Sequence, residues 1–335
     1  MATEGIWRYA DRLPPIRADC RQTLGEGGTP LIRLRGTNIW AKVEAMNPTS
    51  SFKDRGIAYL ISRVVEEGAK RVVIDSSGNA AVSTSAYCAR AGVRLITVMP
   101  GYSHAEKKTQ VLWHGATVLE VADRETARIY ARRVAKELGV RYIGVALDPA
   151  AVPGFQTTAY ELADELEADS VFVPTGSGTN LVAIGRGYRD LEKGGEVPRV
   201  PEMHCVQSAA CAPISGEFTD YKPISSTLAE GVIVPVSERK DDAVKIVRKT
   251  GGNGWVVDDE DIYRALRLLA ENGVYSSPTG AVGVAGALKA RRGGKVVCIV
   301  TDSGLKSNLM LEGFRERIVR VGDDAALERF MAGVG

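Results

Sequence analysis

Short apolar runs alternate with helix-forming stretches along most of this chain, and this alternation restricts its fold more than any other feature. The runs that predict strands are residues 72–74, 95–99, 117–121, 170–173 and 296–300. Helical patterns follow several of them: an Ala-rich stretch to about 90, an amphipathic one over 124–138 and another from about 181. In the second, the residues predicted to share one apolar face are Ala127, Tyr130, Ala131, Val134 and Leu138. Apolar strands separated by helices are typical of parallel sheets covered on both faces. The sequence therefore predicts an α/β fold with mostly parallel twisted sheets.

Turn-rich segments follow three of the predicted strands, at 75–79, 174–180 and 301–304. All three are rich in small and hydroxyl-bearing residues. Ligands of open parallel sheets bind at the carboxyl ends of the strands. We therefore expect these three segments to form one binding site.

Composition excludes several classes of protein. The 335 residues carry 43 Lys and Arg against 41 Asp and Glu, a net charge of +2, which argues against a nucleic-acid-binding protein. No apolar run approaches the roughly 20 residues that span a bilayer, and the first residues do not resemble a signal peptide, so we expect a cytoplasmic protein without membrane partners. Five cysteines without a C-x-x-C pair and three histidines predict no metal site. The scarcity of Asn and Gln, 7 and 4 residues, is a thermophile tendency.

Residues 174–180 (Pro-Thr-Gly-Ser-Gly-Thr-Asn) predict a cradle for phosphate. Gly176 and Gly178 allow the backbone N–H groups to turn inward, and the following helix adds the positive end of its dipole. Ser177 and Thr179 add hydroxyl donors. The alternative is an ordinary tight turn between a strand and a helix, since the spacing matches neither a P-loop nor G-x-G-x-x-G.

Residues 47–56 (Asn-Pro-Thr-Ser-Ser-Phe-Lys-Asp-Arg-Gly) predict a turn and a helix start, capped by Ser50 or Ser51. Lys53 would lie in the first helical turn, where a cation is unfavourable, so we expect a lowered amine pKa. That makes Lys53 a candidate for covalent or proton-transfer chemistry. Taken alone, the pattern is explained better by an exposed lysine that opens an ordinary helix.

Residues 76–79 (Ser-Ser-Gly-Asn) follow a predicted strand, and their N–H groups at a helix start could bind a carboxylate. Simple capping of the helix is the alternative. Together, however, a lysine, a phosphate cradle and a carboxylate site describe pyridoxal phosphate held beside an amino-acid substrate.

The sequence resembles the fold-type II pyridoxal-phosphate enzymes, the tryptophan synthase β superfamily, and within it the threonine synthases. The segments that carry the resemblance occur in the family's order and span nearly the whole chain: 7–9, 25–31, 47–56, 77–79, 176–180 and 301–306. The resemblance implies two domains with the cofactor in the cleft between them. Residues 1–45 and 150–335 would form the large domain and 46–149 a small, mobile one that closes on the substrate. It also implies a homodimer.

The resemblance further implies roles for individual residues. Lys53 would hold the cofactor as a Schiff base and then move protons at the substrate Cα and Cβ, with Phe52 against the ring. Asn79 would hydrogen-bond the ring hydroxyl and Thr301 the pyridine nitrogen, while Asp302 is expected to point elsewhere. The residues implied for the cofactor phosphate are Gly176, Ser177, Gly178, Thr179 and Asn180. Those implied near the substrate carboxylate are Thr49, Ser76, Ser77 and Gly78.

Some segments depart from the threonine synthase pattern. The stretch 148–158, which in those enzymes is basic and grips the substrate phosphate, contains no basic residue here. Family sequences tend to read Glu-Pro-Ala/Ser-Ser/Ala at 277–280 and Thr-Gly-His-Gly at 301–304, where this chain has Ser-Pro-Thr-Gly and Thr-Asp-Ser-Gly. Residues 227–231 look more like a serine/threonine dehydratase segment.

The leading interpretation is an enzyme that converts O-phospho-L-homoserine and water to L-threonine and phosphate. The first alternative is a serine/threonine dehydratase or a β-replacement enzyme similar to cysteine synthase, O-phosphoserine included as a substrate. The second is a non-catalytic binding protein on the same scaffold. Lys53 and the intact 176–180 turn favour an enzyme over a binding protein. The segment after residue 320 is expected to be a peripheral helix without a chemical role.

Overall fold

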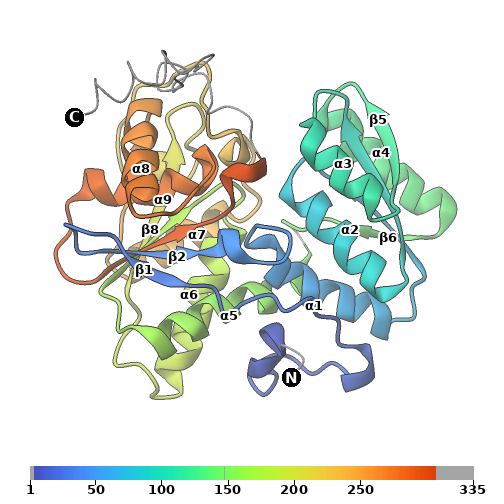
Figure 1. Cartoon of the computed structure of the whole chain (residues 1–335), viewed down its shortest axis with the longest axis horizontal. Coiled ribbons are helices and arrows are strands. Elements are labelled where there is room, and N and C mark those ends of the chain that lie inside the picture. The colour runs from blue at the N-terminus through green and yellow to red at the C-terminus, as the bar shows by residue number, and fades with distance from the viewer. Residues whose placement is uncertain (1–3, 147, 307–335) are drawn as a thin grey trace, which may run out of the picture.

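The chain forms two α/β units that lie side by side, each built on its own sheet (Figure 1). The computed structural model describes residues 4–146 and 148–306. One unit contains a six-stranded sheet and the other a four-stranded sheet. None of the helices in the described ranges is long and apolar enough to cross a membrane.

The larger sheet has six strands, parallel except for the pairing of its first two. In spatial order they are β1 (Leu31–Arg33), β2 (Ile39–Val43), β10 (Val296–Val300), β7 (Ser170–Pro174), β8 (Glu202–Ser208) and β9 (Gly254–Val257). Its helices are α5 (Val152–Glu165), α6 (Thr179–Lys193), α7 (Lys240–Lys249), α8 (Asp259–Glu271) and α9 (Pro278–Ala290).

Successive residues of β10 face opposite sides of the sheet, so this strand is apolar throughout. Val297 and Ile299 pack in the cluster that contains α5, α6 and α7, whereas Val296, Cys298 and Val300 pack with α8 and α9. Both faces of the sheet are therefore covered by helices.

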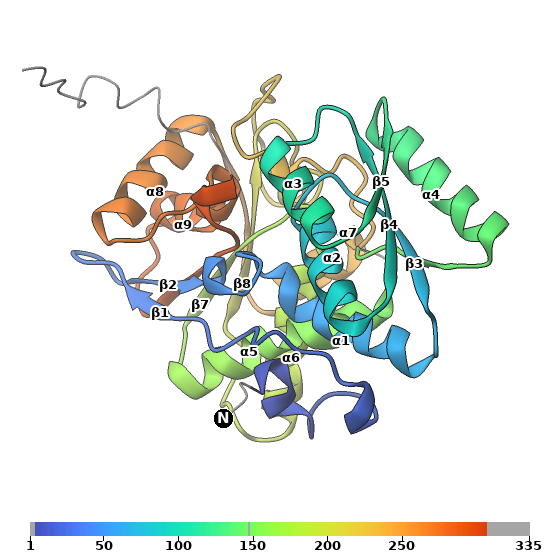
Figure 2. The same ribbon diagram turned by 45° about the vertical axis from the view of Figure 1, so that its right-hand side comes forward.

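The smaller sheet has four parallel strands. In spatial order they are β5 (Thr117–Val121), β4 (Arg94–Pro100), β3 (Arg71–Asp75) and β6 (Arg141–Ile143). The helices of this unit are α2 (Asn79–Ala91), α3 (Ala105–Trp113) and α4 (Arg124–Leu138), with α4 on the face away from the other two (Figure 2).

Helix α1 (Lys53–Glu66) joins the two units, because it packs against both α2 and α5. One continuous apolar core includes residues of α1, of the α2 side of the small sheet and of α5 and α6. Short 3-10 turns complete the described chain: Gly5–Tyr9, Ala18–Cys20, Glu44–Met46, Pro149–Ala151, Ser215–Glu217, Glu230–Val232 and Gly304–Lys306.

The structure confirms the predicted α/β class and all five predicted strands, with ends that differ by at most one residue. It corrects one expectation about packing. The predicted apolar face of α4 included Tyr130 and Leu138, but both are exposed, since only Ala127 and Ala131 are buried against the sheet. The predicted helix after residue 320 lies outside the described residues.

Candidate active site

A cavity of about 380 Å³ lies between the two units, and both contribute to its lining. The lining comes from the start of α1, the turns that follow β3, β7 and β10, and the segments around 100–107, 124–128, 142–146 and 228–234. The three turns that were predicted to share one site therefore do line one cavity.

The turn before Lys53 is held in place by a segment that lies about 250 residues further along the chain. The backbone N–H of Phe52 donates to the carbonyl of Thr301 at 3.0 Å, and that of Ser303 donates to Ser50 at 3.2 Å. Ser51 and Asp302 form an isolated antiparallel bridge. The start of α1 is thus fastened to the turn after β10.

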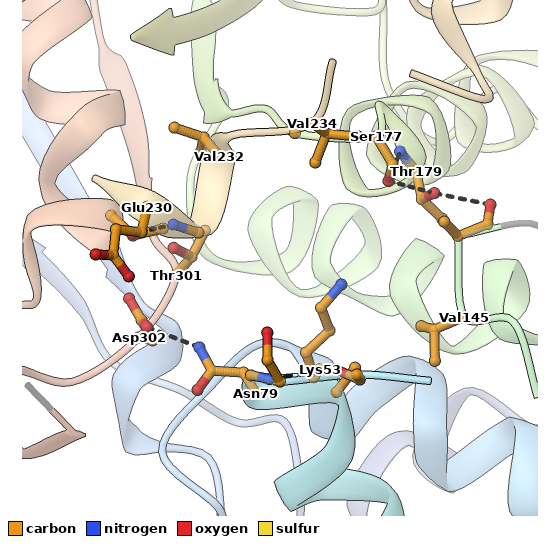
Figure 3. A pocket seen from close by; sticks show the side chains of 18 of the residues that line it. Lys53, Asn79, Val145, Ser177, Thr179, Glu230, Val232, Val234, Thr301 and Asp302 are labelled. Carbon is orange, nitrogen blue, oxygen red and sulfur yellow. Dashed lines mark hydrogen bonds between the residues drawn. The ribbon is translucent and has the colours of Figure 1, made fainter. Parts of the chain in front are cut away.

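The side chain of Lys53 is half-buried and extends into the space between Asn79 and the Ser177–Thr179 turn (Figure 3). Its Nζ lies 4.5 Å from the ring centre of Phe52, a half-buried residue that also lines the cavity. Burial lowers the pKa of Lys53 to about 8. The predicted direction is confirmed, but its cause is desolvation rather than position at the helix start.

The predicted cap of α1 is wrong, because no side chain caps this helix and Phe52 occupies the N-cap position. The carboxylate of Asp54 instead secures the preceding turn: it accepts from the backbone N–H and the hydroxyl of Thr49, each at 2.6 Å. The hydroxyl of Ser83 donates to Asp54 as well, also at 2.6 Å. Thr49 does not line the cavity, and its hydroxyl is already engaged.

The turn after β7 encloses one end of the cavity. Gly178 has φ +90°, and a Cβ at this position would lie 3.2 Å from the carbonyl oxygen of Arg239, so glycine is needed here. The hydroxyls of Ser177 and Thr179 are 3.0 Å apart. Helix α6 begins at Thr179, and its first turn leaves N–H groups without intrahelical acceptors. All five residues from Gly176 to Asn180 line the cavity.

Three lining side chains carry buried polar atoms without a hydrogen-bond partner in the described chain. They are the hydroxyl of Thr301, both amide atoms of Asn180 and Oε2 of Glu238. Each orphaned buried group costs about 1–3 kcal/mol, so such groups are rare unless a ligand satisfies them. Their position indicates that the cavity is built around a polar ligand.

The turn after β3 forms the opposite wall, where Ser76, Ser77, Gly78 and Asn79 line the cavity. Asp302, expected to point elsewhere, lies against this wall: Asn79 Nδ2 donates to its Oδ2 at 2.7 Å (Figure 3). The carboxylate of Asp302 is thus engaged by Asn79 and Ser277, and the expectation that it points away from the ring nitrogen stays a prediction.

Sequence reasoning missed two lysines of the lining. Lys306 is only 3% exposed, and its Nζ donates to Asn79 Oδ1 at 3.3 Å. Lys107, on α3, has no ion-pair partner among the described residues, whereas the nearby Arg128 contacts Asp75 and Glu238 at 3.9 and 3.4 Å. Lys306 lies in a recognised motif, but nothing in the sequence around Lys107 distinguishes it from a surface residue.

Comparison with known proteins identifies the family. The model of the family described as pyridoxal-phosphate dependent enzymes matches residues 22–302. The chain belongs to this family. The threonine synthase of Methanocaldococcus jannaschii is 33% identical over 329 residues, which cover 90% of this chain and 80% of the relative. That of Mycobacterium tuberculosis is 33% identical over 319 residues, covering 90% and 88%.

Solved structures agree with the fold. Maize serine racemase has a TM-score of 0.73 at 21% identity, covering 86% of this chain and 92% of its own. A threonine deaminase from T.th. has a TM-score of 0.70 at 25% identity, covering 82% and 92%. The first likeness concerns the fold alone.

The cavity of this pyridoxal-phosphate dependent enzyme fits its cofactor. A phosphate needs several N–H and hydroxyl donors, which the Gly176–Asn180 turn supplies together. The unpartnered hydroxyl of Thr301 suits a ring nitrogen, and an amine of lowered pKa suits the aldehyde. The donor set thus matches the three polar ends of pyridoxal phosphate.

Proposed function

We propose that this enzyme converts O-phospho-L-homoserine and water to L-threonine and phosphate. The curated relatives described above, both named threonine synthase and similar over 90% of this chain, carry the proposal. The chemistry needs a base that acts on Cα and Cβ, and Lys53 is the lining residue whose lowered pKa and position suit that role.

We propose that the cofactor spans the cavity from the turn after β7 to the turn after β3. Gly176, Ser177, Gly178, Thr179 and Asn180 would hold its phosphate, Phe52 would contact its ring, and Asn79 and Thr301 would bond the ring hydroxyl and nitrogen. Bound there, pyridoxal phosphate supplies an electrophilic carbonyl and an electron-accepting ring. The neutral hydroxyl of Thr301 does not protonate the ring nitrogen, which favours elimination and replacement over transamination.

The substrate would bind across the same cavity. The turn of Ser76, Ser77 and Gly78 would bind its α-carboxylate, and Lys53 would take the Cα proton and move protons at Cβ. The bond between Cγ and the phosphate oxygen breaks, the proton removed from Cβ is replaced by one delivered to Cγ, and the Cα proton is returned. The hydroxyl of water adds at Cβ and its proton goes to the released phosphate, so that the reaction balances. Thr49 is a weaker part of the proposal, because its hydroxyl donates to Asp54.

The substrate phosphate is a second anionic group beside the α-carboxylate and needs a cationic side chain. The segment 148–158 contains no basic residue and does not line the cavity. Lys107 lines it without an ion-pair partner among the described residues, which favours a substrate with a second anionic group over serine or threonine. We assign the substrate phosphate to Lys107 for this reason.

A substrate panel tests the proposal. The holoenzyme is incubated with O-phosphohomoserine, O-phosphoserine, serine and threonine, and amino acids, 2-oxo acids and phosphate are quantified. We expect threonine and phosphate in equal amounts from O-phosphohomoserine. No turnover of this compound would overturn the proposal.

Lys107→Met sharpens the same test. Loss of a charge-assisted contact to phosphate predicts about a tenfold or larger fall in kcat/KM for O-phosphohomoserine. Lys108→Met is the matched control, because Lys108 pairs with Glu120 at the surface of the same region. An equal effect of both substitutions would contradict a specific role for Lys107.

A dehydratase is the second candidate. Residues Leu228, Glu230 and Gly231, from the segment that resembles dehydratases, line the cavity, and a threonine deaminase is 25% identical to this chain. In the substrate panel this candidate predicts 2-oxo acids from serine or threonine, with no threonine from O-phosphohomoserine.

We further propose that residues 46–149 close over the substrate and that the enzyme is a cytoplasmic homodimer. The cavity between the units supports closure, since movement of one unit would expel water from it. Small-angle scattering with and without substrate tests closure, and sedimentation analysis tests the dimer. An unchanged scattering profile, or a monomer at assay concentration, would overturn the corresponding proposal.

A further inference from the structure

Four side chains from three parts of the fold form a continuous hydrogen-bonded chain along one wall of the cavity. Ser277 Oγ donates to Asp302 Oδ1, Asn79 Nδ2 donates to Asp302 Oδ2 at 2.7 Å, and Lys306 Nζ donates to Asn79 Oδ1 at 3.3 Å. Asp302 and Lys306 are 4% and 3% exposed. The amide of Asn79 therefore lies between a buried anion and a buried cation, with Asp302 beside it in Figure 3.

The two charges fix the orientation of this amide. An ammonium group only donates hydrogen bonds, so the atom that faces Lys306 must be the amide oxygen. A carboxylate only accepts them, so the atom that faces Asp302 must be the amide nitrogen. Rotation of the amide by half a turn would set its N–H groups against the ammonium and its oxygen against the carboxylate. Both contacts would then be repulsive.

The residues around the buried carboxylate of Asp302 leave space for it and bind it. A Cβ at Gly280 would lie 2.7 Å from the carbonyl oxygen of Asp302 and 3.0 Å from its Oδ1, so glycine leaves the necessary space. Ser277 both donates to Asp302 and caps α9, where its Oγ accepts from the N–H of Gly280 at 3.0 Å. Ser277, Gly280 and Asp302 all lie in two of the segments where this chain departs from the threonine synthase pattern, 277–280 and 301–304.

The orientation has a consequence for the cavity. The amide nitrogen of Asn79 carries two hydrogens, and Asp302 engages one of them. The other is available to an acceptor in the cavity, such as the ring hydroxyl of the cofactor. A reversed amide would present an acceptor at the same place.

We propose that Asp302 and Lys306 are positioning residues that hold the Asn79 amide with its nitrogen toward the cofactor. The inference rests on the proposed assignment of Asn79 to the ring hydroxyl, but not on the identity of the amino-acid substrate. Neither residue touches the reacting atoms; both act through Asn79.

A double-mutant cycle tests this inference with pyridoxal phosphate alone, so its outcome is separate from that of the substrate panel. Dissociation constants and absorption spectra of the bound cofactor are measured for the full-length wild type, Lys306→Met, Asp302→Asn and Asn79→Ala, and for each of the first two substitutions combined with Asn79→Ala. Lys108→Met serves as the charge control. Melting of each cofactor-free protein reports folding.

We expect Lys306→Met to weaken cofactor binding about tenfold and to shift the spectrum toward that of Asn79→Ala, because a charge-assisted hydrogen bond is lost. In the Asn79→Ala background the same substitution should change the constant less than about twofold, since residues that act through one group are not additive. Should Lys306→Met fail to fold, Asp302→Asn, which keeps the shape of the side chain, provides the same comparison. Equal effects with and without Asn79, or an unchanged constant and spectrum, would overturn the inference.

Discussion

Charged side chains on the two sides of the start of α1 lie in opposite environments. On one side they are ion-paired, and on the other side an amine has no ion-pair partner in the described chain. Arg55 is fully buried, and its guanidinium contacts Glu44 at 2.7 Å and Glu161 at 2.7 Å. Lys42 completes this group with contacts of 3.1 Å to Glu161 and 2.9 Å to Glu165. Although burial opposes it, Arg55 holds the pKa of Glu161 below its usual range.

Lys53 lies two residues away on the cavity side, and no carboxylate of the described chain lies within 4 Å of its amine. Burial therefore lowers the pKa of Lys53 with no nearby anion to oppose the shift. The side-chain hydroxyl of Thr301 and the side-chain amide of Asn180 also lack hydrogen-bond partners in the described chain. The comparison teaches that the protein's own groups pair the buried charges on the Arg55 side. On the Lys53 side, polar groups are left for a ligand to pair.

The largest expected effect comes from Lys53→Ala. Loss of the proposed base should reduce turnover by at least about 10²–10⁴-fold, and the absorbance of covalently bound cofactor should disappear. The melting temperature of the cofactor-free protein should not fall, because Lys53 has no ion-pair partner in the described chain. Turnover near the wild-type level would contradict the proposed role, and Lys108→Ala is the control.

On the paired side, Arg55→Met should instead reduce stability. It would leave Glu44 and Glu161 buried without their main counter-ion, which costs about 3–5 kcal/mol. Denaturant unfolding of the cofactor-free protein measures this loss. A free energy of unfolding equal to that of the wild type would show that the two sides do not differ as described.

The pH dependence of cofactor uptake tests the unpaired side. The neutral amine of Lys53 is the reactive form, and with a pKa of about 8 its population rises as the pH increases through that value. Uptake by the cofactor-free protein should rise about tenfold from pH 7 to 9 and then level off. An amine of ordinary pKa would make the rate climb well beyond pH 9. Since Lys306 also has a pKa of about 8, the profile is repeated with Lys306→Met.

The smallest expected effect comes from Thr301→Val, which removes a buried hydroxyl without changing the shape of the side chain. The cofactor-free protein should gain about 1 kcal/mol, because an unsatisfied group is removed, while cofactor affinity should fall. Thermal melting and a binding titration measure the two changes. A loss of stability without cofactor would mean that the protein itself satisfies this hydroxyl.

Two strands of the larger sheet show what the sequence could predict about the fold. Strand β10 was recognisable because all five of its residues are apolar and buried. Strand β8 was not, since His204 and Gln207 interrupt its apolar pattern. Each accepts a hydrogen bond from a distant backbone N–H: Asn253 donates to His204 Nδ1 at 2.9 Å, and Ile214 donates to Gln207 Oε1 at 2.8 Å. His204 Nε2 has no hydrogen-bond partner in the described chain.

The site was predictable where it is local. The glycines, hydroxyls and lysine of its turns are adjacent in the sequence, and so the turns could be recognised. The contact between Asn79 and Asp302 joins residues 223 positions apart, and it depends on how two units pack. Local patterns carry no such information, which is why neither the contact between Asn79 and Asp302 nor the position of Lys107 was predicted.

Chemical identification of the lysine that binds the cofactor tests the central claim most directly. The holoenzyme is treated with borohydride, digested and mapped by mass spectrometry. Lys53, Lys107 and Lys306 all line the cavity, and Lys306 matches Lys53 in its lowered pKa of about 8, but Lys306 is hydrogen-bonded to Asn79. We predict that the phosphopyridoxyl group is found on Lys53. Its recovery on Lys107 or Lys306, or on no lysine of the cavity, would contradict the proposed site.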